Sequence, residues 1–228
     1  MSLADGFVYL SDVDPSIIQV MSYATDANFI GAKIDGYLKA CAILTIQAAR
    51  AVQEVQLRLR LGGFSLVVYD AYRPQKAVDH FIRWSNDADD LKMRNMYYPS
   101  ITNKRQIFDL GYISTKSSHS RGSALDVSII KLRDVYKVNP KVKQRKIPGG
   151  RILPYLDDGT LDMYTSFDLF DQASMHDTTL IPKQNLAWRQ YLRVTMQNAG
   201  FLDYQKEWWH YTLDNEPFKD TYFDFDVC

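Results

Sequence analysis

The chain has 228 residues, of which 46% are hydrophobic and 24% are charged; this balance excludes wholesale disorder and fits a single globular domain over residues 1–228. Basic and acidic residues number 27 each, so the basic excess of nucleic-acid binding proteins is missing and no nucleic-acid partner is expected. No run approaches the roughly 20 apolar residues of a membrane-spanning helix, so no transmembrane segment is expected.

Residues 1–20 contain three aspartates and no lysine or arginine, which is not the pattern of a signal peptide. Met1-Ser2-Leu3 could be an expression scar that replaces a removed export signal. A removed signal would mean a periplasmic protein, and a native start would mean a cytoplasmic one. The sequence leaves both locations open.

The two cysteines, Cys41 and Cys228, lie far apart in the chain and could pair with each other. Two are too few for a disulfide framework or for a zinc site made of cysteines. Any bound metal must therefore have histidine and carboxylate ligands. The four histidines are His80, His119, His176 and His210.

The predicted helices and strands are separated by wide polar stretches. In chain order they are a helix at 37–61 that ends at Gly62-Gly63, a strand at 64–69, a helix at 74–84 that begins at Pro74, a strand at 124–130, a helix at 185–199 that is followed by Gly200, and a strand that contains 210–213.

Two stretches resemble insertions rather than core elements. Residues 85–117 are polar and rich in tyrosine, and residues 131–165 are punctuated by proline and glycine. Because the strict alternation of strands and helices with short loops is missing, we predict an α+β fold, with a small, mainly antiparallel sheet flanked by helices.

The segment Ser117-Ser118-His119-Ser120-Arg121-Gly122-Ser123-Ala124-Leu125-Asp126 joins a loop to a predicted strand. A loop that enters a strand can bring the His119 imidazole and the Asp126 carboxylate to one point, and both groups are good zinc ligands. The alternative is a polar loop followed by an aspartate at the sheet surface.

A second cluster, Glu207-Trp208-Trp209-His210-Tyr211, offers one more imidazole and a carboxylate. The two tryptophans would exclude bulk water and raise the pKa of Glu207. The alternative is an aromatic core strand with an incidental glutamate at its edge. Together the two clusters supply two histidines and one aspartate, which leaves a fourth zinc position open for water, as in catalytic sites.

A third segment, Asp70-Ala71-Tyr72-Arg73-Pro74, follows a predicted buried strand. Pro74 biases Arg73 away from helical backbone angles, so the guanidinium leaves the end of the sheet in a fixed direction. There it could stabilise an oxyanion. The alternative is a structural ion pair between Arg73 and Asp70.

These three segments, in this order, resemble the VanX-type D-alanyl-D-alanine dipeptidases, which are zinc metallopeptidases of the lysostaphin, D-Ala-D-Ala peptidase and hedgehog fold group. The resemblance runs from Tyr23-Ala24-Thr25 to Tyr222-Phe223-Asp224-Phe225. It implies one Zn²⁺ per chain bound by His119, Asp126 and His210. It also implies that Glu207 is the general base for the zinc-bound water and that Arg73 stabilises the oxyanion.

The resemblance further implies a small dipeptide substrate, D-Ala-D-Ala, which is hydrolysed to free D-alanine. Asp168 would receive its ammonium group, Ser117 and the neighbourhood of Tyr112 would bind its carboxylate, and Tyr23 would help to close the pocket. Two other hypotheses stay open: a zinc DD-carboxypeptidase or murein endopeptidase that acts on longer wall peptides, and a binding module without catalysis.

The stretch from Lys131 to Arg151 contains eight basic residues and one acidic residue, Asp134. It is part of the stretch from Lys131 to Thr165, which looks longer than in compact members of the family. It is either a solvated loop or a contact with an anionic membrane or wall surface. His80 is predicted to be an exposed helix residue, and His176 a loop residue with a minor role in the pocket.

Overall fold

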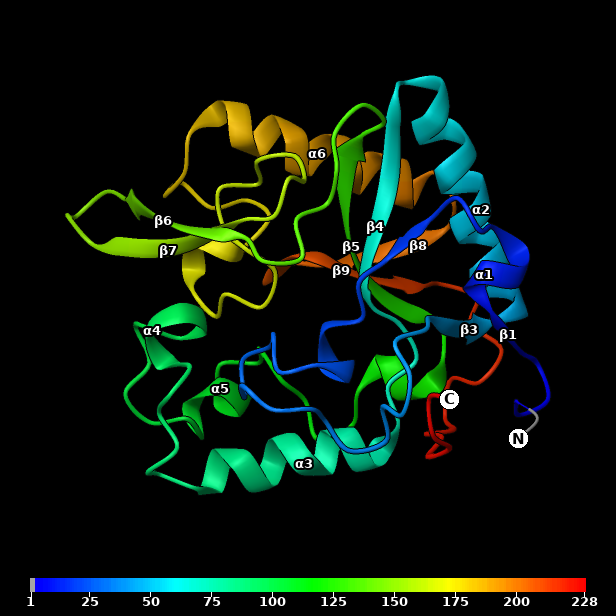
Figure 1. Cartoon of the computed structure of the whole chain (residues 1–228), viewed down its shortest axis with the longest axis horizontal. Coiled ribbons are helices and arrows are strands. Elements are labelled where there is room, and N and C mark those ends of the chain that lie inside the picture. Colours follow the sequence, from blue (N-terminus) through cyan, green and yellow to red (C-terminus); the bar gives the residue numbers. More distant parts are fainter. Residues whose placement is uncertain (1–2) are drawn as a thin grey trace.

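The computed structural model describes residues 3–228 and has a five-stranded sheet at its centre, with the order β2-β4-β5-β9-β8 (Figure 1). These strands are β2 (Ile18–Gln19), β4 (Phe64–Asp70), β5 (Ala124–Lys131), β8 (Phe201–Tyr204) and β9 (Glu207–Leu213). Only the β2–β4 pair is parallel within this sheet of the described chain. The predicted α+β class is therefore confirmed. Of the suggested scar Met1-Ser2-Leu3, the first two residues lie outside the described residues.

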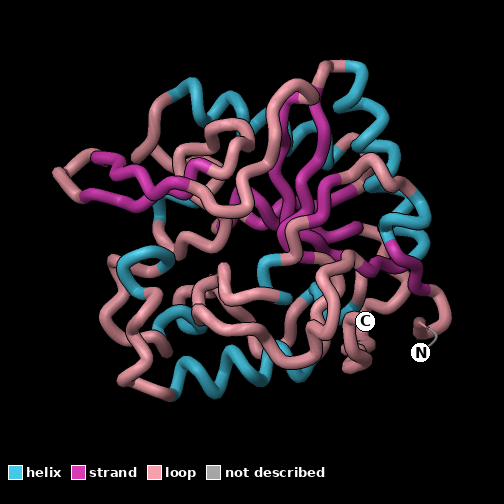
Figure 2. The backbone as a smooth tube through the Cα atoms, viewed as in Figure 1, coloured by secondary structure: helices cyan, strands magenta, loops and turns pink. Residues whose placement is uncertain are grey.

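Helices lie on both sides of this sheet (Figures 1 and 2). Two long helices, α2 (Ile46–Leu61) and α6 (Lys183–Gln197), pack against each other and against the sheet. On the other side lie α3 (Gln75–Asn86), α4 (Arg94–Tyr97) and α5 (Gln106–Asp109). Within residues 3–228, every helix is too short or too polar to span a bilayer.

The smaller elements connect and extend these layers. They are the antiparallel pair β1 (Phe7–Tyr9) and β3 (Ile43–Thr45), the short helix α1 (Leu10–Val13), the hairpin of β6 (Lys141–Lys146) and β7 (Ile152–Asp157), and three 3₁₀ turns, η1 (Ser22–Ala24), η2 (Ser118–Arg121) and η3 (Gln172–Ser174).

The helix predicted at 37–61 is wrong at its beginning. Residues 43–45 form β3 instead, because they pair with β1, a partner that is distant in sequence. The helix begins after Thr45, whose hydroxyl accepts a hydrogen bond from the amide of Ala48 at 3.3 Å. A threonine cap of this kind favours a helix start at the following residue. The helix ends at the predicted glycines, where Gly63 has a φ of +82°.

The prediction of residues 85–117 as a polar excursion outside the core is also wrong. Tyr97, Tyr98 and Ile107 are buried, and the Tyr98 ring contacts the edge of Trp84 at 5.5 Å between centroids. These apolar residues follow no helical or strand period, so the sequence pattern did not reveal their burial. The stretch forms one wall of the cavity described below.

The remaining long elements agree closely with prediction. β4, β5 and β9 contain the predicted strands, and α3 and α6 differ from the predicted helices by one or two residues at each end. Pro74 caps α3 rather than opening it, and Asn198 is the C-cap of α6, so Gly200 lies one residue later than expected. Strand β8 was missed, because its four residues alternate only weakly.

The β6–β7 hairpin occupies the predicted insertion at 131–165 and projects from the body of the molecule (Figure 1). Part of its positive charge is neutralised locally. Lys137 and Lys143 contact Asp157, while the other ion pairs join Arg145 to Asp162 and Arg151 to Asp171.

Candidate metal centre

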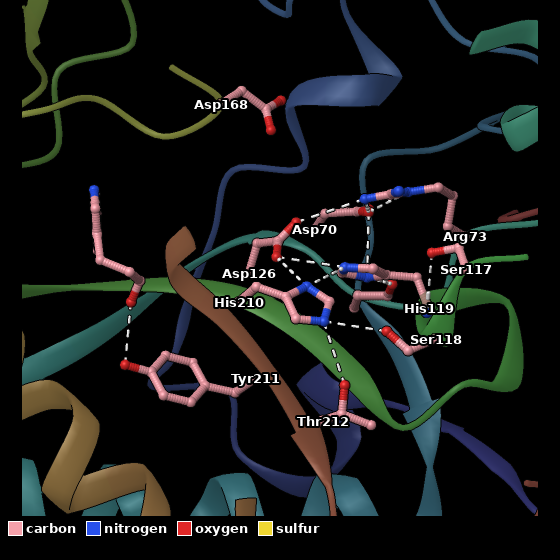
Figure 3. A network of polar contacts seen from close by, with 12 residues as sticks. Asp70, Arg73, Ser117, Ser118, His119, Asp126, Asp168, His210, Tyr211 and Thr212 are labelled. Carbon is pink, nitrogen blue, oxygen red and sulfur yellow. Dashed lines mark hydrogen bonds and ion pairs between the residues drawn. The ribbon is translucent and has the colours of Figure 1, made fainter. Parts of the chain in front are cut away.

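Three elements bring His119, Asp126 and His210 together (Figure 3). Asp126 on β5 pairs directly with His210 on β9, and His119 lies in the η2 turn that leads into β5. The side chains from the two predicted segments therefore meet at one point, because adjacent antiparallel strands place opposite residues about 5 Å apart. The predicted grouping of the two histidines and the aspartate is present in the structure.

The three facing atoms form a nearly regular triangle. His210 Nδ1 is 3.0 Å from Asp126 Oδ1, His119 Nε2 is 3.1 Å from His210 Nδ1, and His119 Nε2 is 3.4 Å from Asp126 Oδ1. Ligands about 2.0–2.1 Å from a tetrahedral zinc ion lie about 3.3 Å apart, so this triangle has the size of one face of a zinc tetrahedron.

The second nitrogen of each imidazole fixes the direction of the first. His119 Nδ1 lies 2.7 Å from the carbonyl oxygen of Ala71, so it carries the proton and donates it there. His210 Nε2 lies 3.1 Å from the Ser118 hydroxyl and 3.3 Å from that of Thr212. With protons placed on these outer nitrogens, two lone pairs and one carboxylate oxygen face one point. A cation satisfies such a donor set.

The charges of the triad also fit a metal site. Burial raises the pKa of Asp126, but the two neighbouring histidines outweigh burial and hold that pKa well below its ordinary value. Burial lowers the pKa of His210. These two directions favour an ionised Asp126 carboxylate and a neutral His210 imidazole, which are the forms that bind metal.

Gly122 shapes the turn between His119 and β5. Its φ is +82°, and an added Cβ would lie 2.1 Å from the Phe7 ring, which is packed among other aromatic side chains. We expect Gly122→Ala to lower the free energy of unfolding by about 3 kcal/mol or more, since strain and overpacking add. Urea denaturation with Gly63→Ala as the control checks this, because Gly63 has the same φ and open space around it. Equal losses in both variants would contradict it.

Arg73 forms the ion pair with Asp70 that the sequence analysis gave as an alternative, and it also lines the cavity of the triad. Its guanidinium donates to Asp70 at 2.9 Å through both Nε and Nη2, and Asp70 also accepts from the Tyr37 hydroxyl at 2.6 Å. The structural ion pair therefore exists. Arg73 Nη2 also lies 3.6 Å from Asp126, and Arg73 lines the same cavity as the triad. The ion pair holds the guanidinium at the site.

A cavity of about 650 Å³ opens over the triad. Every site residue predicted from the sequence lines it: Tyr23, Arg73, Tyr112, Ser117, His119, Asp126, Asp168, Glu207 and His210. Asp168 lies apart from the triad in Figure 3, and its carboxylate accepts a hydrogen bond from the Tyr23 hydroxyl at 2.8 Å. Tyr112 stacks on Phe170 at 5.5 Å, and the Ser117 hydroxyl caps η2 at the amide of His119.

Two buried carboxyl groups in this cavity have strongly shifted acidity. Burial, and then the negative charge of Asp126, raise the pKa of Glu207 well above its ordinary value. The same two causes raise the pKa of Asp168. Raised carboxyl pKa values next to a set of metal donors are typical of catalytic acids and bases. A cation bound by the triad would oppose both shifts.

Three neighbouring predictions are wrong. Trp209 lines the cavity, but Trp208 faces elsewhere and donates its indole N–H to Thr165 at 2.9 Å. His80 is half-buried and accepts a hydrogen bond from the Asp35 amide. His176 lies in a loop as expected, yet it packs beside Tyr211 away from the cavity, because the strand places Tyr211 and His210 on opposite faces.

Sequence reasoning missed the groups that orient the two imidazoles of the triad. These are the Ala71 carbonyl and the hydroxyls of Ser118 and Thr212. Ser118 and Thr212 lie one and two residues from His119 and His210 in sequence, which was the one available signal. A backbone carbonyl gives none.

Comparison with known proteins places the chain in a family. A family model described as D-ala-D-ala dipeptidase matches residues 3–139 and 152–228. The chain belongs to that family. The unmatched residues, 140–151, comprise β6 and the turn of the hairpin, and they lie within the stretch 131–165 that the sequence analysis described as an insertion.

Relatives named D-alanyl-D-alanine dipeptidase match nearly the whole chain. The protein of Streptomyces coelicolor is 36% identical over 97% of this chain and 98% of its own length. That of Enterococcus faecalis is 34% identical over 99% of this chain and 100% of its own length. A crystal structure of the vancomycin resistance D,D-pentapeptidase VanY with Zn(II) matches 78% of this chain and 76% of its own, with 14% identity and a TM-score of 0.40.

Proposed function

We propose that this protein is a zinc-dependent dipeptidase that hydrolyses D-alanyl-D-alanine to free D-alanine. The observation that carries the proposal is the triangle of His119, Asp126 and His210 donor atoms in one cavity with Glu207. Membership of the D-ala-D-ala dipeptidase family, and relatives that carry the dipeptidase name, support the choice of substrate.

The donor set favours zinc, with one ion per chain. Two imidazoles and one carboxylate form the usual ligand set of a catalytic zinc site, and they leave one position open. When bound, zinc supplies Lewis acidity for the scissile carbonyl and acidifies a water molecule.

Glu207 is the proton carrier in this proposal. It is buried, lines the cavity and begins β9 three residues before the ligand His210. Its carboxylate accepts the proton that the attacking water releases and gives it to the nitrogen of the leaving amine. Burial and the neighbouring carboxylates raise the pKa of Glu207 and so favour its protonated form, which increases its affinity for that proton.

Two groups of residues in the cavity would select substrates with the length of a dipeptide by binding its two charged ends. Asp168, held by Tyr23, receives the ammonium group of the substrate. Ser117 and Tyr112 lie on the cavity wall, where they bind the carboxylate. A longer peptide would leave a charged group of the site without its partner, which is an effective means of rejection.

Hydrolysis of three peptides tests the proposed function. We expect release of D-alanine from D-Ala-D-Ala, and little release from an L,L-dipeptide or from a pentapeptide that ends in D-Ala-D-Ala. Preference for the pentapeptide would support the DD-carboxypeptidase or endopeptidase alternative. No hydrolysis of any peptide by the zinc-loaded protein would support the non-catalytic alternative.

Arg73→Ala should lower kcat by about 10²-fold with a much smaller change in KM. The substitution removes a guanidinium that, in this proposal, stabilises negative charge that develops only in the transition state. Zinc content should stay at the value of the unchanged protein. Steady-state kinetics with D-Ala-D-Ala measures both constants. A rise in KM alone would instead make Arg73 a uniform substrate-binding residue.

We also propose that the hairpin contacts an anionic membrane surface. Lys141 and Lys146 are exposed and form no ion pair within residues 3–228, while the nearby Val135 and Val138 are each 78% exposed. Lysines beside exposed apolar residues favour a charged lipid interface. The periplasmic location stays a prediction, with the cytoplasm as its alternative.

Sedimentation with phosphatidylglycerol vesicles tests this contact. Each lysine near such a surface contributes about 1 kcal/mol, so Lys141→Gln with Lys146→Gln should weaken binding about 25-fold. Phosphatidylcholine vesicles should bind neither protein. Absence of binding to both vesicle types, or binding to purified cell wall alone, would contradict a membrane contact.

A further inference from the structure

We propose that Arg189 is a positioning residue that fixes Asp168 in the cavity by tying together the two ends of the loop that carries it. The proposal rests on the role of Asp168 as the receptor of the substrate ammonium group. It adds a residue on α6, on the far side of the sheet, to the determinants of substrate affinity.

The side chain of Arg189 reaches both ends of this loop. At the first end, Nε and Nη2 donate to the carbonyl oxygen of Met163 at 3.0 and 2.7 Å. At the second end, Nη1 donates to the carbonyl oxygen of Met175 at 2.8 Å. Asp168 lies between these two residues in sequence. The Arg189 guanidinium therefore links the two ends of the loop 163–175, and these hydrogen bonds are called the clasp below.

A third contact connects Arg189 to the interior of the loop. Nη2 also donates to the Thr165 hydroxyl at 3.0 Å, and that hydroxyl accepts the indole N–H of Trp208 at 2.9 Å. Ser174 bonds the same hydroxyl at 3.1 Å and donates to the carbonyl of Leu169 at 2.7 Å. The residues on either side of Asp168 are thus held by one hydrogen-bonded network.

The position of Arg189 is energetically unfavourable by itself. The residue is 1% exposed, and within residues 3–228 no carboxylate forms an ion pair with it. Burial lowers its pKa to about 9. A buried guanidinium with only carbonyl and hydroxyl partners costs free energy unless these hydrogen bonds are all made. Its planar fork spans both ends of the loop, which the single ammonium group of a lysine would not do.

The loop needs such restraint because its backbone is strained. Asp168 has a φ of +60° and Tyr164 has a φ of +71°, both in the left-handed region that favours glycine. Residues other than glycine keep this backbone conformation only where surrounding contacts hold it in place. With the clasp released, Asp168 would relax towards ordinary angles and move relative to Tyr23, and the ammonium group would lose its partner.

A double-mutant cycle in the full-length, zinc-loaded protein tests the proposal. We expect Arg189→Lys to raise KM for D-Ala-D-Ala about tenfold with kcat changed less than about threefold. Asp168→Asn should raise KM at least as much. The variant with both substitutions should equal Asp168→Asn within about twofold, because Arg189 acts only through Asp168. Arg193→Lys, one turn along α6 and paired with Asp203 instead, is the matched control.

The outcomes separate this proposal from the proposed function. Inactivity of the unchanged protein would overturn the proposed function, and a normal KM in Asp168→Asn would overturn the ammonium role of Asp168 and with it this proposal. Additive losses, or a fall in kcat alone, would overturn the clasp and leave the proposed function intact. Hydrogen exchange gives a readout without turnover: Arg189→Lys should speed exchange within residues 163–175 and leave 118–126 unchanged. If Arg189→Lys fails to fold, Thr165→Val removes the shared hydroxyl and should show the same pattern.

Discussion

Glu207→Gln is expected to lower kcat for D-Ala-D-Ala by about 10³-fold while zinc content stays unchanged, since general acid–base catalysis by one residue contributes about 10²–10⁴-fold. The substitution keeps the size of the side chain and removes the proton-accepting carboxylate. Glu207 is not a member of the triad of donor atoms, so the metal should remain bound. Steady-state kinetics and elemental analysis of the dialysed protein measure the two quantities.

Two controls make this result specific. Glu54→Gln, on the exposed side of α2, should leave kcat unchanged. The Glu207→Gln protein should also unfold at a urea concentration no lower than the unchanged protein, because the substitution replaces a buried carboxyl that favours its neutral form. A near-normal kcat in this variant would remove Glu207 from the mechanism.

His119→Ala is expected to lose both the metal and the activity. The substitution removes one of three donors, and a site with two donors binds zinc far more weakly. Removal of a group that only hydrogen-bonds to a ligand already lowers metal affinity about 10–100-fold, so removal of a ligand should lower it more. The Asp126 carboxylate also loses a partner that holds its pKa low. Zinc per chain after dialysis, measured by elemental analysis, should fall from one to near zero.

His80→Ala is the matched control, because His80 lies outside the cavity and contacts Asp35. Its zinc content and kcat should equal those of the unchanged protein. Ser118→Ala should show an intermediate result, with weaker zinc binding and partial activity, since its hydroxyl orients the His210 ring. Full zinc occupancy in His119→Ala would overturn the ligand assignment.

The three residues of the triad could be picked out from the sequence because they lie in short segments next to strong strand signals. Asp126 follows the turn at Gly122 and begins a β-branched run, and His210 lies in an aromatic one. The composition of both runs is enough to predict that they are buried strands. The register that puts Asp126 opposite His210 did not follow from either segment, and the resemblance to a family implied only that the three residues act together.

Elements whose structure depends on distant partners could not be predicted. Residues 43–45 lead directly into a helix in the sequence, and their pairing with β1, which is distant in sequence, makes them a strand. Tyr98 and Ile107 are buried by tertiary packing in a stretch that has no period. The link from Arg189 to the loop of Asp168 is of the same kind, because it joins a helix to carbonyl groups that any residue would offer.

Anomalous X-ray diffraction at the zinc absorption edge is the most direct measurement of the central claim. We expect one peak per chain, placed between His119 Nε2, His210 Nδ1 and Asp126 Oδ1, with the Glu207 carboxyl group on the open side. A peak elsewhere, or zinc ligands that include other residues of the chain, would contradict the account even if the protein proved to be a peptidase.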